Sequence, residues 1–319
     1  MQGSKRIAVV GAGFMGTVIA TLYARHGYEV ALHDTAPQML ESYRERALPI
    51  AESLADEDIS AERILRGVSG ERQLSNAVEH AFLVHEVVQE VLPIKQELFA
   101  LLDRKCPRDV VLATNTSSFL LSDICRDVKQ RDRVLGIHYI TPAHVIRAVE
   151  LIYADFTPSV IVEWGRNFLA SIDHIGVACR ERPGFLVNRL QFALLSEVYR
   201  IMDEGLASRD DVDTAVRLSL GPRLALWGPL LTEDLVVNKK TSLAVTEYLH
   251  EQTGEPNFAA RPVLRRLVDE GKAGAVSGEG WYRFAAGYPA VVARRDAQLK
   301  ELLAWLRLKN PIAHIGVET

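Results

Sequence analysis

Residues 5–34 read KRIAVVGAGFMGTVIATLYARHGYEVALHD, and this stretch decides the fold of the first half of the chain. A short apolar run leads into a GxGxxG motif made by Gly11, Gly13 and Gly16. Residues 14–26 have helical length and spacing, and residues 28–33 form a second β-like run that closes on Asp34. Strand, glycine turn, helix and strand in this order predict a βαβ unit that binds a dinucleotide.

Each glycine of the motif has a mechanical reason. The first allows a tight turn, the second lets the backbone approach a pyrophosphate, and the third lets the helix pack close to the strand. Phe14 and Met15 open the helix, whose free N–H groups favour phosphate, so we expect both beside the cofactor. Asp34 can accept hydrogen bonds from the adenosine ribose and would repel a 2′-phosphate, and its neighbours Thr35 and Ala36 supply no positive charge. We therefore expect NAD rather than NADP; the alternative is a glycine turn with no ligand.

Length and composition bound the remaining possibilities. The chain has 319 residues, enough for two domains of about 150 residues each, and 48% of them are hydrophobic. A formal net charge of −4 argues against nucleic acid as a partner. The three cysteines are too few and too widely spaced for a disulfide framework or a CxxC zinc site and favour a reducing compartment: Cys106, Cys125 and Cys179. Without a long apolar run or a signal peptide, we expect a soluble cytoplasmic protein and no membrane partner.

The pattern along the chain predicts a Rossmann-type α/β domain at residues 1–182 and an all-α domain at residues 183–319. In the first half, strand and helix patterns alternate, with a helical insertion at residues 36–70. Further strands are expected at residues 82–88, 110–113, 134–138, 149–153 and 175–179. After Pro183 strand signals are sparse, and residues 185–203 are apolar on nearly every face, which predicts a buried helix. More helices are expected near residues 208–218, 241–252, 263–270 and 291–308.

Four short segments behind GAGFMG resemble the 3-hydroxyacyl-CoA dehydrogenase superfamily. They are TNTSS at 114–118, GIH at 136–138, VEL at 149–151 and PGFLVNR at 183–189. The resemblance covers most of the chain and includes QEVLPIKQELF at residues 89–99. It implies NAD-dependent chemistry in fatty acid metabolism and a homodimer built through the helical domain.

The resemblance also implies roles for individual residues. His138 matches the catalytic histidine, and Glu150 matches the carboxylate that orients it. Ser117 and Asn188 match the polar residues that hold the substrate. Three further residues are expected at the cofactor. Glu90 and Lys95 match residues beside the nicotinamide ribose, and the third is Asn115 of TNTSS.

Elementary chemistry supports the same roles. Oxidation of an alcohol needs a group that accepts the hydroxyl proton, and histidine changes its charge near neutral pH. A carboxylate on the other ring nitrogen would hold the tautomer and stabilise the imidazolium. Three of these residues also have a purely structural interpretation. Glu150 could pair with Arg147, Ser117 could cap a helix, and Lys95 could be a solvated charge on a helix. His80 and His85 lack a ligand-like context, so we expect no metal.

The sequence also departs from the acyl-CoA pattern. Where those members read HFFNP, this chain reads HYITP at residues 138–142, so Thr141 replaces an asparagine near the substrate. The segment GPRLALWGP at 221–229 and the extension ARRDAQLKELLAWL at 293–306 look like the λ-crystallin / L-gulonate 3-dehydrogenase and carnitine dehydrogenase branch. Arg223 suits a free carboxylate, which it can bind bidentately, or it forms a surface ion pair. In contrast, TNTSS and GEGWYRF at 278–284 look like acyl-CoA members.

We therefore predict an NAD-dependent oxidoreductase that acts on the 3-hydroxyl of a 3-hydroxy acid or 3-hydroxyacyl-CoA, with His138 as general base. For the thioester, residues 36–70 could contact the CoA through basic side chains, namely Arg44, Arg46, Arg63 and Arg66. The alternatives are a dehydrogenase of free 3-hydroxy (sugar) acids that uses Arg223, or a catalytically silent, crystallin-like NAD-binding protein.

Overall fold

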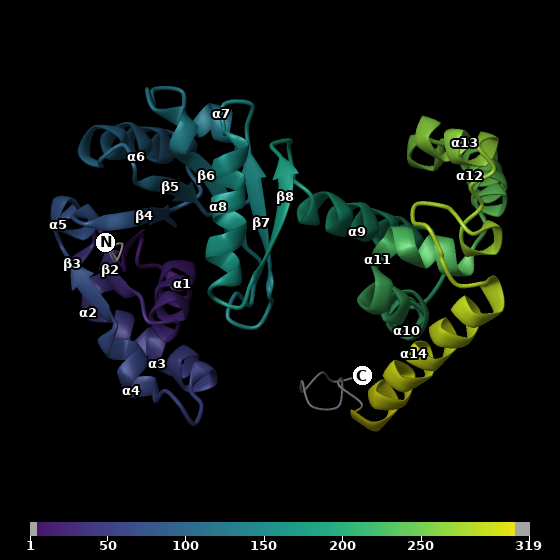
Figure 1. Ribbon diagram of the computed structural model, residues 1–319, viewed down its shortest axis with the longest axis horizontal. Coiled ribbons are helices and arrows are strands. Elements are labelled where there is room, and N and C mark those ends of the chain that lie inside the picture. Colours follow the sequence, from purple (N-terminus) through teal and green to yellow (C-terminus); the bar gives the residue numbers. More distant parts are fainter. Residues whose placement is uncertain (1–4, 310–319) are drawn as a thin grey trace. The chain divides into compact units, whose positions relative to one another are not determined.

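The structure is a computed structural model that describes residues 5–309. It divides into two compact units, Met1–Leu195 and Ser196–Thr319, whose elements are labelled in Figure 1. The sequence predicts a domain boundary between residues 182 and 183, whereas the division between the compact units falls later, inside helix α9 (Val187–Asp203).

The first unit is built on one eight-stranded sheet with strand order β3-β2-β1-β4-β5-β6-β7-β8. Neighbouring strands are parallel except β6 and β7, which are antiparallel. The strands are β1 (Arg6–Val10), β2 (Glu29–His33), β3 (Val68–Glu71), β4 (Ala81–Glu86), β5 (Val111–Thr114), β6 (Val134–Tyr139), β7 (Ala148–Tyr153) and β8 (Ile175–Arg180). The chain order reverses between β1 and β4, and ligands of such sheets bind at the carboxyl ends of the strands beside this switch point.

Both faces of the sheet are covered by helices, because alternate residues of each strand point to opposite faces. Ile7 and Val9 pack in the hydrophobic cluster that includes α1 (Phe14–Arg25) and α8 (Ser159–Ala170). Ala8 and Val10 pack in the second cluster, with α6 (Leu92–Lys105) and α7 (Leu121–Ile124). Figure 1 shows α8 lying along β6, β7 and β8. The short helices α5 (Leu74–Val78) and η1 (Arg131–Arg133) connect strands.

The insertion after β2 is helical, with one correction. It contains α2 (Pro37–Glu41), α3 (Tyr43–Leu54) and α4 (Ala61–Arg66). The expectation of helix throughout residues 36–70 is wrong at its end, where β3 pairs with β2 at the sheet edge. Edge strands need few apolar residues, and the sequence VSGE has one, so hydrophobic periodicity does not reveal this strand.

The second unit is helical. It contains the end of α9, then α10 (Arg209–Ala215), η2 (Val216–Leu220), α11 (Gly221–Val236), α12 (Lys239–Thr253), η3 (Pro256–Phe258), α13 (Pro262–Asp269), η4 (Ala275–Ser277) and α14 (Tyr288–Lys309). The sequence did not predict α11, because two Gly-Pro pairs suggest a loop. In the structure Pro222 lies in its first turn, where proline is tolerated, and Gly228 breaks the helix with a φ of +70°.

The expectation that α9 is a buried helix is wrong for this chain taken alone. None of the α9 side chains is buried. Three large ones are more than half exposed: Leu190, Phe192 and Tyr199. Apolar residues on nearly every face predict burial, but the described part of one chain does not supply enough neighbours to cover this helix.

Candidate active site

The glycine turn after β1 is close-packed. Gly11 has a φ of +112°, and its N–H donates to the carbonyl of His33 at 2.7 Å, which ties the turn to β2. A Cβ on Gly11 would lie 2.5 Å from the carbonyl oxygen of Val87, and a Cβ on Gly16 would lie 1.8 Å from that of Gly11. These two glycines are therefore required by the close approach of backbone segments, as the sequence motif predicts.

The middle glycine is different, because a Cβ on Gly13 would meet nothing within 4 Å. The open space in front of this residue adjoins the N-terminus of α1, where Phe14 is exposed and Met15 is partly buried. Backbone N–H groups at such a helix start favour phosphate groups. The turn therefore fits the pyrophosphate of a dinucleotide.

Asp34 follows β2 and lies against the same turn. Its Oδ2 accepts a hydrogen bond from the N–H of Ala12 at 2.7 Å, and its Oδ1 accepts one from the N–H of Ala36 at 2.9 Å. These two bonds hold the carboxylate at the end of the strand, where an acidic residue contacts the adenosine ribose in dinucleotide sites of this type. The turn and Asp34 together fit NAD.

His138 and Glu150 form the second part of the site. They are register partners on the antiparallel strands β6 and β7, so the two side chains point to the same face of the sheet. His138 Nδ1 lies 2.7 Å from Glu150 Oε2, and both residues are buried. Within residues 5–309, His138 Nε2 makes no hydrogen bond, which leaves that nitrogen able to exchange a proton with a substrate.

The second oxygen of Glu150 holds the start of α9. Oε1 accepts hydrogen bonds from the N–H groups of Leu186 and Val187, each at 2.8 Å. Burial on its own would raise the pKa of Glu150, but the bonds from His138 and from the two backbone amides outweigh it, so the pKa lies below its usual value. Glu150 is therefore ionised at neutral pH and can stabilise a positive charge on the imidazole.

Ser117 and Asn188 also meet in the structure. The Nδ2 of Asn188 donates to the carbonyl of Ser117 at 2.9 Å. Asn115 lies two residues before Ser117, and its Oδ1 accepts from the N–H of Tyr139, the residue after His138, at 2.9 Å. The loop after β5 is thus joined both to the end of β6 and to the first turn of α9.

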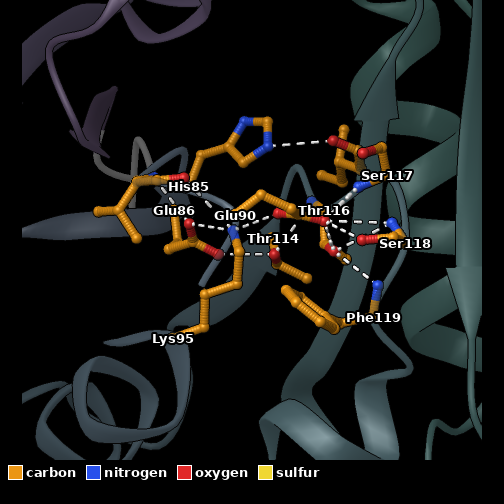
Figure 2. Close-up of polar contacts among 11 residues, drawn as sticks. His85, Glu86, Glu90, Lys95, Thr114, Thr116, Ser117, Ser118 and Phe119 are labelled. Carbon is orange, nitrogen blue, oxygen red and sulfur yellow. Dashed lines mark hydrogen bonds and ion pairs between the residues drawn. The ribbon is translucent and has the colours of Figure 1, made fainter. Parts of the chain in front are cut away.

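Figure 2 shows a dense polar network that joins this loop to β4 and α6. Lys95 is only 1% exposed, and its Nζ lies 2.8 Å from Glu86 Oε1 and 3.1 Å from Glu90 Oε2. The interpretation of Lys95 as a solvated helix charge is therefore wrong, because the side chain points from α6 into the protein. The same position brings Lys95 together with Glu90.

Glu90 binds the loop itself. Its Oε1 accepts hydrogen bonds from the hydroxyls of Thr116 and Ser118, at 2.6 and 2.7 Å, and from the N–H groups of Ser117 and Ser118, each at 3.1 Å. Burial raises the pKa of Glu90, but these hydroxyls and Lys95 outweigh it, so that the pKa is lowered. Glu86 behaves oppositely: its burial dominates and raises its pKa in spite of Lys95 and Thr114.

Some residues of the site escape sequence reasoning. Glu86, Thr116 and Ser118 order the loop. Thr116 and Ser118 belong to the TNTSS motif but receive no role from the sequence, and the only sequence signal of Glu86 is an acidic residue at a strand end. Thr141, three residues after His138, contacts the sulfur of Met15 at 3.6 Å, which links the end of β6 to the start of α1. Thr141 therefore lies beside the helix start that follows the glycine turn.

Arg223 lies in the second unit. Its guanidinium donates to the carbonyl of Ser219 at 2.9 Å, one helical turn away, and its carbonyl accepts from the hydroxyl of Thr232. The site residues described in the paragraphs above all belong to the first unit. Among residues 5–309 no cluster of three histidine, cysteine or acidic residues could hold a metal ion, and no helix there is long and apolar enough to cross a membrane.

Comparison with known proteins shows which family carries this pattern. Residues 6–182 match the family model for the 3-hydroxyacyl-CoA dehydrogenase NAD-binding domain, and residues 184–284 match the C-terminal domain of the same family. The human mitochondrial hydroxyacyl-coenzyme A dehydrogenase is 33% identical over 290 residues, which cover 88% of this chain and 91% of that protein. A 3-hydroxybutyryl-CoA dehydrogenase of Mycobacterium tuberculosis is 33% identical over 287 residues, which cover 88% and 98%.

The similarity extends to three dimensions. The crystal structure of a 3-hydroxyacyl-CoA dehydrogenase from Archaeoglobus fulgidus matches with a TM-score of 0.82 at 29% identity and covers 95% of this chain and 99% of that one. Both units are therefore shared with these relatives, and the similarity is not limited to the dinucleotide-binding part.

Proposed function

This chain belongs to the 3-hydroxyacyl-CoA dehydrogenase family, and from that premise we propose that it interconverts the 3-hydroxyl and 3-keto forms of an acyl-CoA thioester with NAD. The observation that carries the proposal is the buried pair of His138 and Glu150, with 2.7 Å between Nδ1 and Oε2. The pair lies at the end of β6, at the same edge of the sheet as the glycine turn, since β1 and β6 run parallel.

His138 acts as the general base in this proposal. Glu150 holds the proton on Nδ1, so Nε2 has a lone pair that accepts the proton of the substrate hydroxyl. As the imidazole becomes positively charged, the ionised Glu150 stabilises it. NAD bound at the glycine turn would supply the acceptor for the hydride that leaves the carbon bearing this hydroxyl. In the reverse direction the imidazolium returns the proton to the ketone oxygen.

Ser117 and Asn188 position the substrate. Within the described residues the hydroxyl of Ser117 and the Oδ1 of Asn188 make no hydrogen bond, so both remain able to bind a substrate hydroxyl or carbonyl. Glu90 and Lys95 order the loop that contains Ser117, and we place them with Asn115 on the nicotinamide side of the cofactor. The family pattern supports this assignment, and the network in Figure 2 shows that Glu90 and Lys95 contact one another and that Glu90 contacts the loop.

The test is NAD reduction followed at 340 nm with purified protein and 3-hydroxybutyryl-CoA. His138→Gln should lower turnover by about 10²- to 10⁴-fold, the usual contribution of a general base, while NADH binding is retained. The matched control is His80→Gln, because His80 is exposed and directly precedes β4, at the amino end of that strand rather than at the carboxyl ends where the site lies. Near-normal turnover of His138→Gln would refute the role, and NADH binding without turnover of any substrate would favour a silent, crystallin-like protein.

A free 3-hydroxy acid is the second candidate substrate. The segment at residues 221–229, which looks like the branch that oxidises free acids, supports it, and Arg223 of that segment would bind the carboxylate. Thr141 is a second departure from the acyl-CoA pattern. The same assay with 3-hydroxybutyrate, L-gulonate and carnitine separates the two candidates. Turnover of a free acid that is lost in Arg223→Met and kept in Arg209→Met, a change of an exposed arginine in the same unit, would support the second candidate.

We also propose a homodimer and a cytoplasmic location. The exposed apolar side chains of α9 support the dimer, because such a surface is usually covered by a partner; sedimentation of the protein, with Phe192→Glu as the disrupting variant, tests it. Cys106, Cys125 and Cys179 are all free thiols, which suits a reducing compartment. Fractionation of the source cells tests the location.

A further inference from the structure

Arg46 reaches the cofactor turn from the helical insertion. It lies in the first turn of α3, and its Nη2 donates to the carbonyl of Ala12 at 2.7 Å and to that of Met39 at 2.8 Å. Its Nη1 donates to the hydroxyl of Ser42 at 2.5 Å. Ala12 is the residue between the first two glycines of the motif, so the guanidinium lies against the turn itself.

The same residue, Ala12, is also bound by Asp34. The carboxylate of Asp34 accepts from the amide of Ala12, and the guanidinium of Arg46 donates to its carbonyl. A negative and a positive side chain therefore flank one residue of the turn, at the end of β2 where the adenosine ribose binds in this fold. The sequence near Asp34 contains no positive charge, and the structure supplies one from twelve positions further along the chain.

Arg46 also retains donors that the described chain does not use. A guanidinium has five N–H groups, and the bonds to Ala12, Met39 and Ser42 account for three of them. The buried Nε has no hydrogen-bond partner among residues 5–309. This Nε is enclosed, so the donor left for an incoming anion is the second N–H of Nη1, which bonds only to Ser42 among residues 5–309. A hydrogen bond from a charged guanidinium to an anion is among the stronger ones.

Dinucleotide sites distinguish NAD from NADP at this position by charge. An acidic residue at the end of β2 selects the ribose hydroxyl of NAD, and a nearby arginine accommodates the 2′-phosphate of NADP. This chain has both groups. We propose that Arg46 is a specificity-determining residue for the cofactor: it forms a binding group for the 2′-phosphate that Asp34 keeps out.

Two consequences follow for the natural protein, and both rest on the NAD site of the proposed function. The selectivity for NAD comes from Asp34, which acts against a positive charge already present at the turn. Arg46 also weakens that selectivity, since its positive charge partly offsets the repulsion between Asp34 and a 2′-phosphate. Removal of Arg46 should therefore increase the preference of the protein for NAD.

The experiment measures binding rather than turnover. NADH and NADPH are titrated into the full chain without substrate, and nicotinamide fluorescence gives each dissociation constant. Asp34→Ser should bind NADPH about 10- to 100-fold more tightly than the natural protein does, as expected for a charged hydrogen bond to phosphate. The double variant Asp34→Ser/Arg46→Met should lose this gain, and Arg46→Met alone should weaken NADPH binding more than NADH binding.

Arg44→Met is the matched control. Arg44 is on the same helix, is exposed, and has its guanidinium 5.8 Å from the centre of the Tyr43 ring rather than at the turn. In the Asp34→Ser background it should leave NADPH binding within about two- to three-fold, the usual effect of a surface substitution. Circular dichroism checks that each variant is folded.

Three results would overturn the proposal. In the first, the double variant keeps the gain in NADPH binding; in the second, Asp34→Ser binds NADH but gains no affinity for NADPH. In the third, Arg46→Met weakens NADH and NADPH equally, which would make Arg46 only an anchor of the turn. A natural protein that binds no NADH would overturn the cofactor site as well, whereas NADH binding without turnover would refute only the proposed activity.

Discussion

Glu150→Gln is the sharpest test of how the site works. In the structure one carboxylate oxygen faces His138 Nδ1 at 2.7 Å, and the other accepts from the backbone amides of Leu186 and Val187. Glutamine has a single acceptor oxygen. If that oxygen stays on the two amides, its NH₂ group faces Nδ1, and the imidazole must carry its proton on Nε2. This tautomer cannot accept a proton from the substrate.

The magnitude follows from the geometry. Two unit charges 2.7 Å apart attract by about 6 kcal/mol in an effective dielectric of about 20. One factor of ten in rate corresponds to about 1.4 kcal/mol, so full loss of this attraction in the transition state would lower turnover by about 10⁴-fold. Relaxation around the glutamine recovers part of the loss, and we expect a decrease of about 10²- to 10⁴-fold.

The assay compares kcat, the KM for 3-hydroxybutyryl-CoA and the dissociation constant for NADH. The expected result is a decrease in kcat with NADH binding unchanged, because Glu150 does not contact the glycine turn. The control is Glu163→Gln, which removes the same charge from an exposed position on α8. Turnover of Glu150→Gln within about three-fold of normal would refute the reasoning, since only a structural role leaves such a small effect.

The remaining predictions concern the cofactor turn and the buried ionisable groups. Gly13→Ala should keep the melting temperature but weaken NADH binding, because its Cβ meets no protein atom and enters the space proposed for the pyrophosphate. Gly16→Ala should lower the free energy of unfolding by about 1–3 kcal/mol or more, because its Cβ would lie 1.8 Å from the backbone oxygen of Gly11. Burial lowers the pKa of His85 from 6.5 to about 3. As the pH is lowered, His85 therefore takes up its proton in the unfolded chain before it does so in the folded protein. The free energy of unfolding should decrease below pH 6.5, by about 2 kcal/mol at pH 5. Denaturant titrations at several pH values should show a smaller decrease for His85→Gln than for the natural protein. Lys95→Met should lower the free energy of unfolding by about 3–5 kcal/mol, because it leaves Glu86 buried without its partner, and addition of Glu86→Gln should restore part of that loss.

Much of the site was predictable because strand ends and motifs are local features. His138 and Glu150 lie 12 residues apart in sequence, and each ends or begins an apolar run that folds as a strand. Their pairing needs only the antiparallel register of β6 and β7. Sequence reasoning did not identify Glu86, because its role depends on a residue of α6. Only the packing of α6 on the sheet buries Lys95 against this carboxylate.

The sequence by itself determined the dinucleotide-binding fold, the glycine turn and the preference for NAD that the carboxylate of Asp34 causes. These features depend on backbone sterics and on residues that are close together in the chain. Tertiary structure alone decided which groups Arg46 and Lys95 meet. Arg46 lies 34 residues from Ala12, and Lys95 lies beside Glu86 and Glu90 only because α6 packs on the sheet. Hydrophobic periodicity specifies which face of an element is buried, but it does not specify where a long polar side chain ends. That position depends on the packing of distant elements, and the charges at this site depend on it.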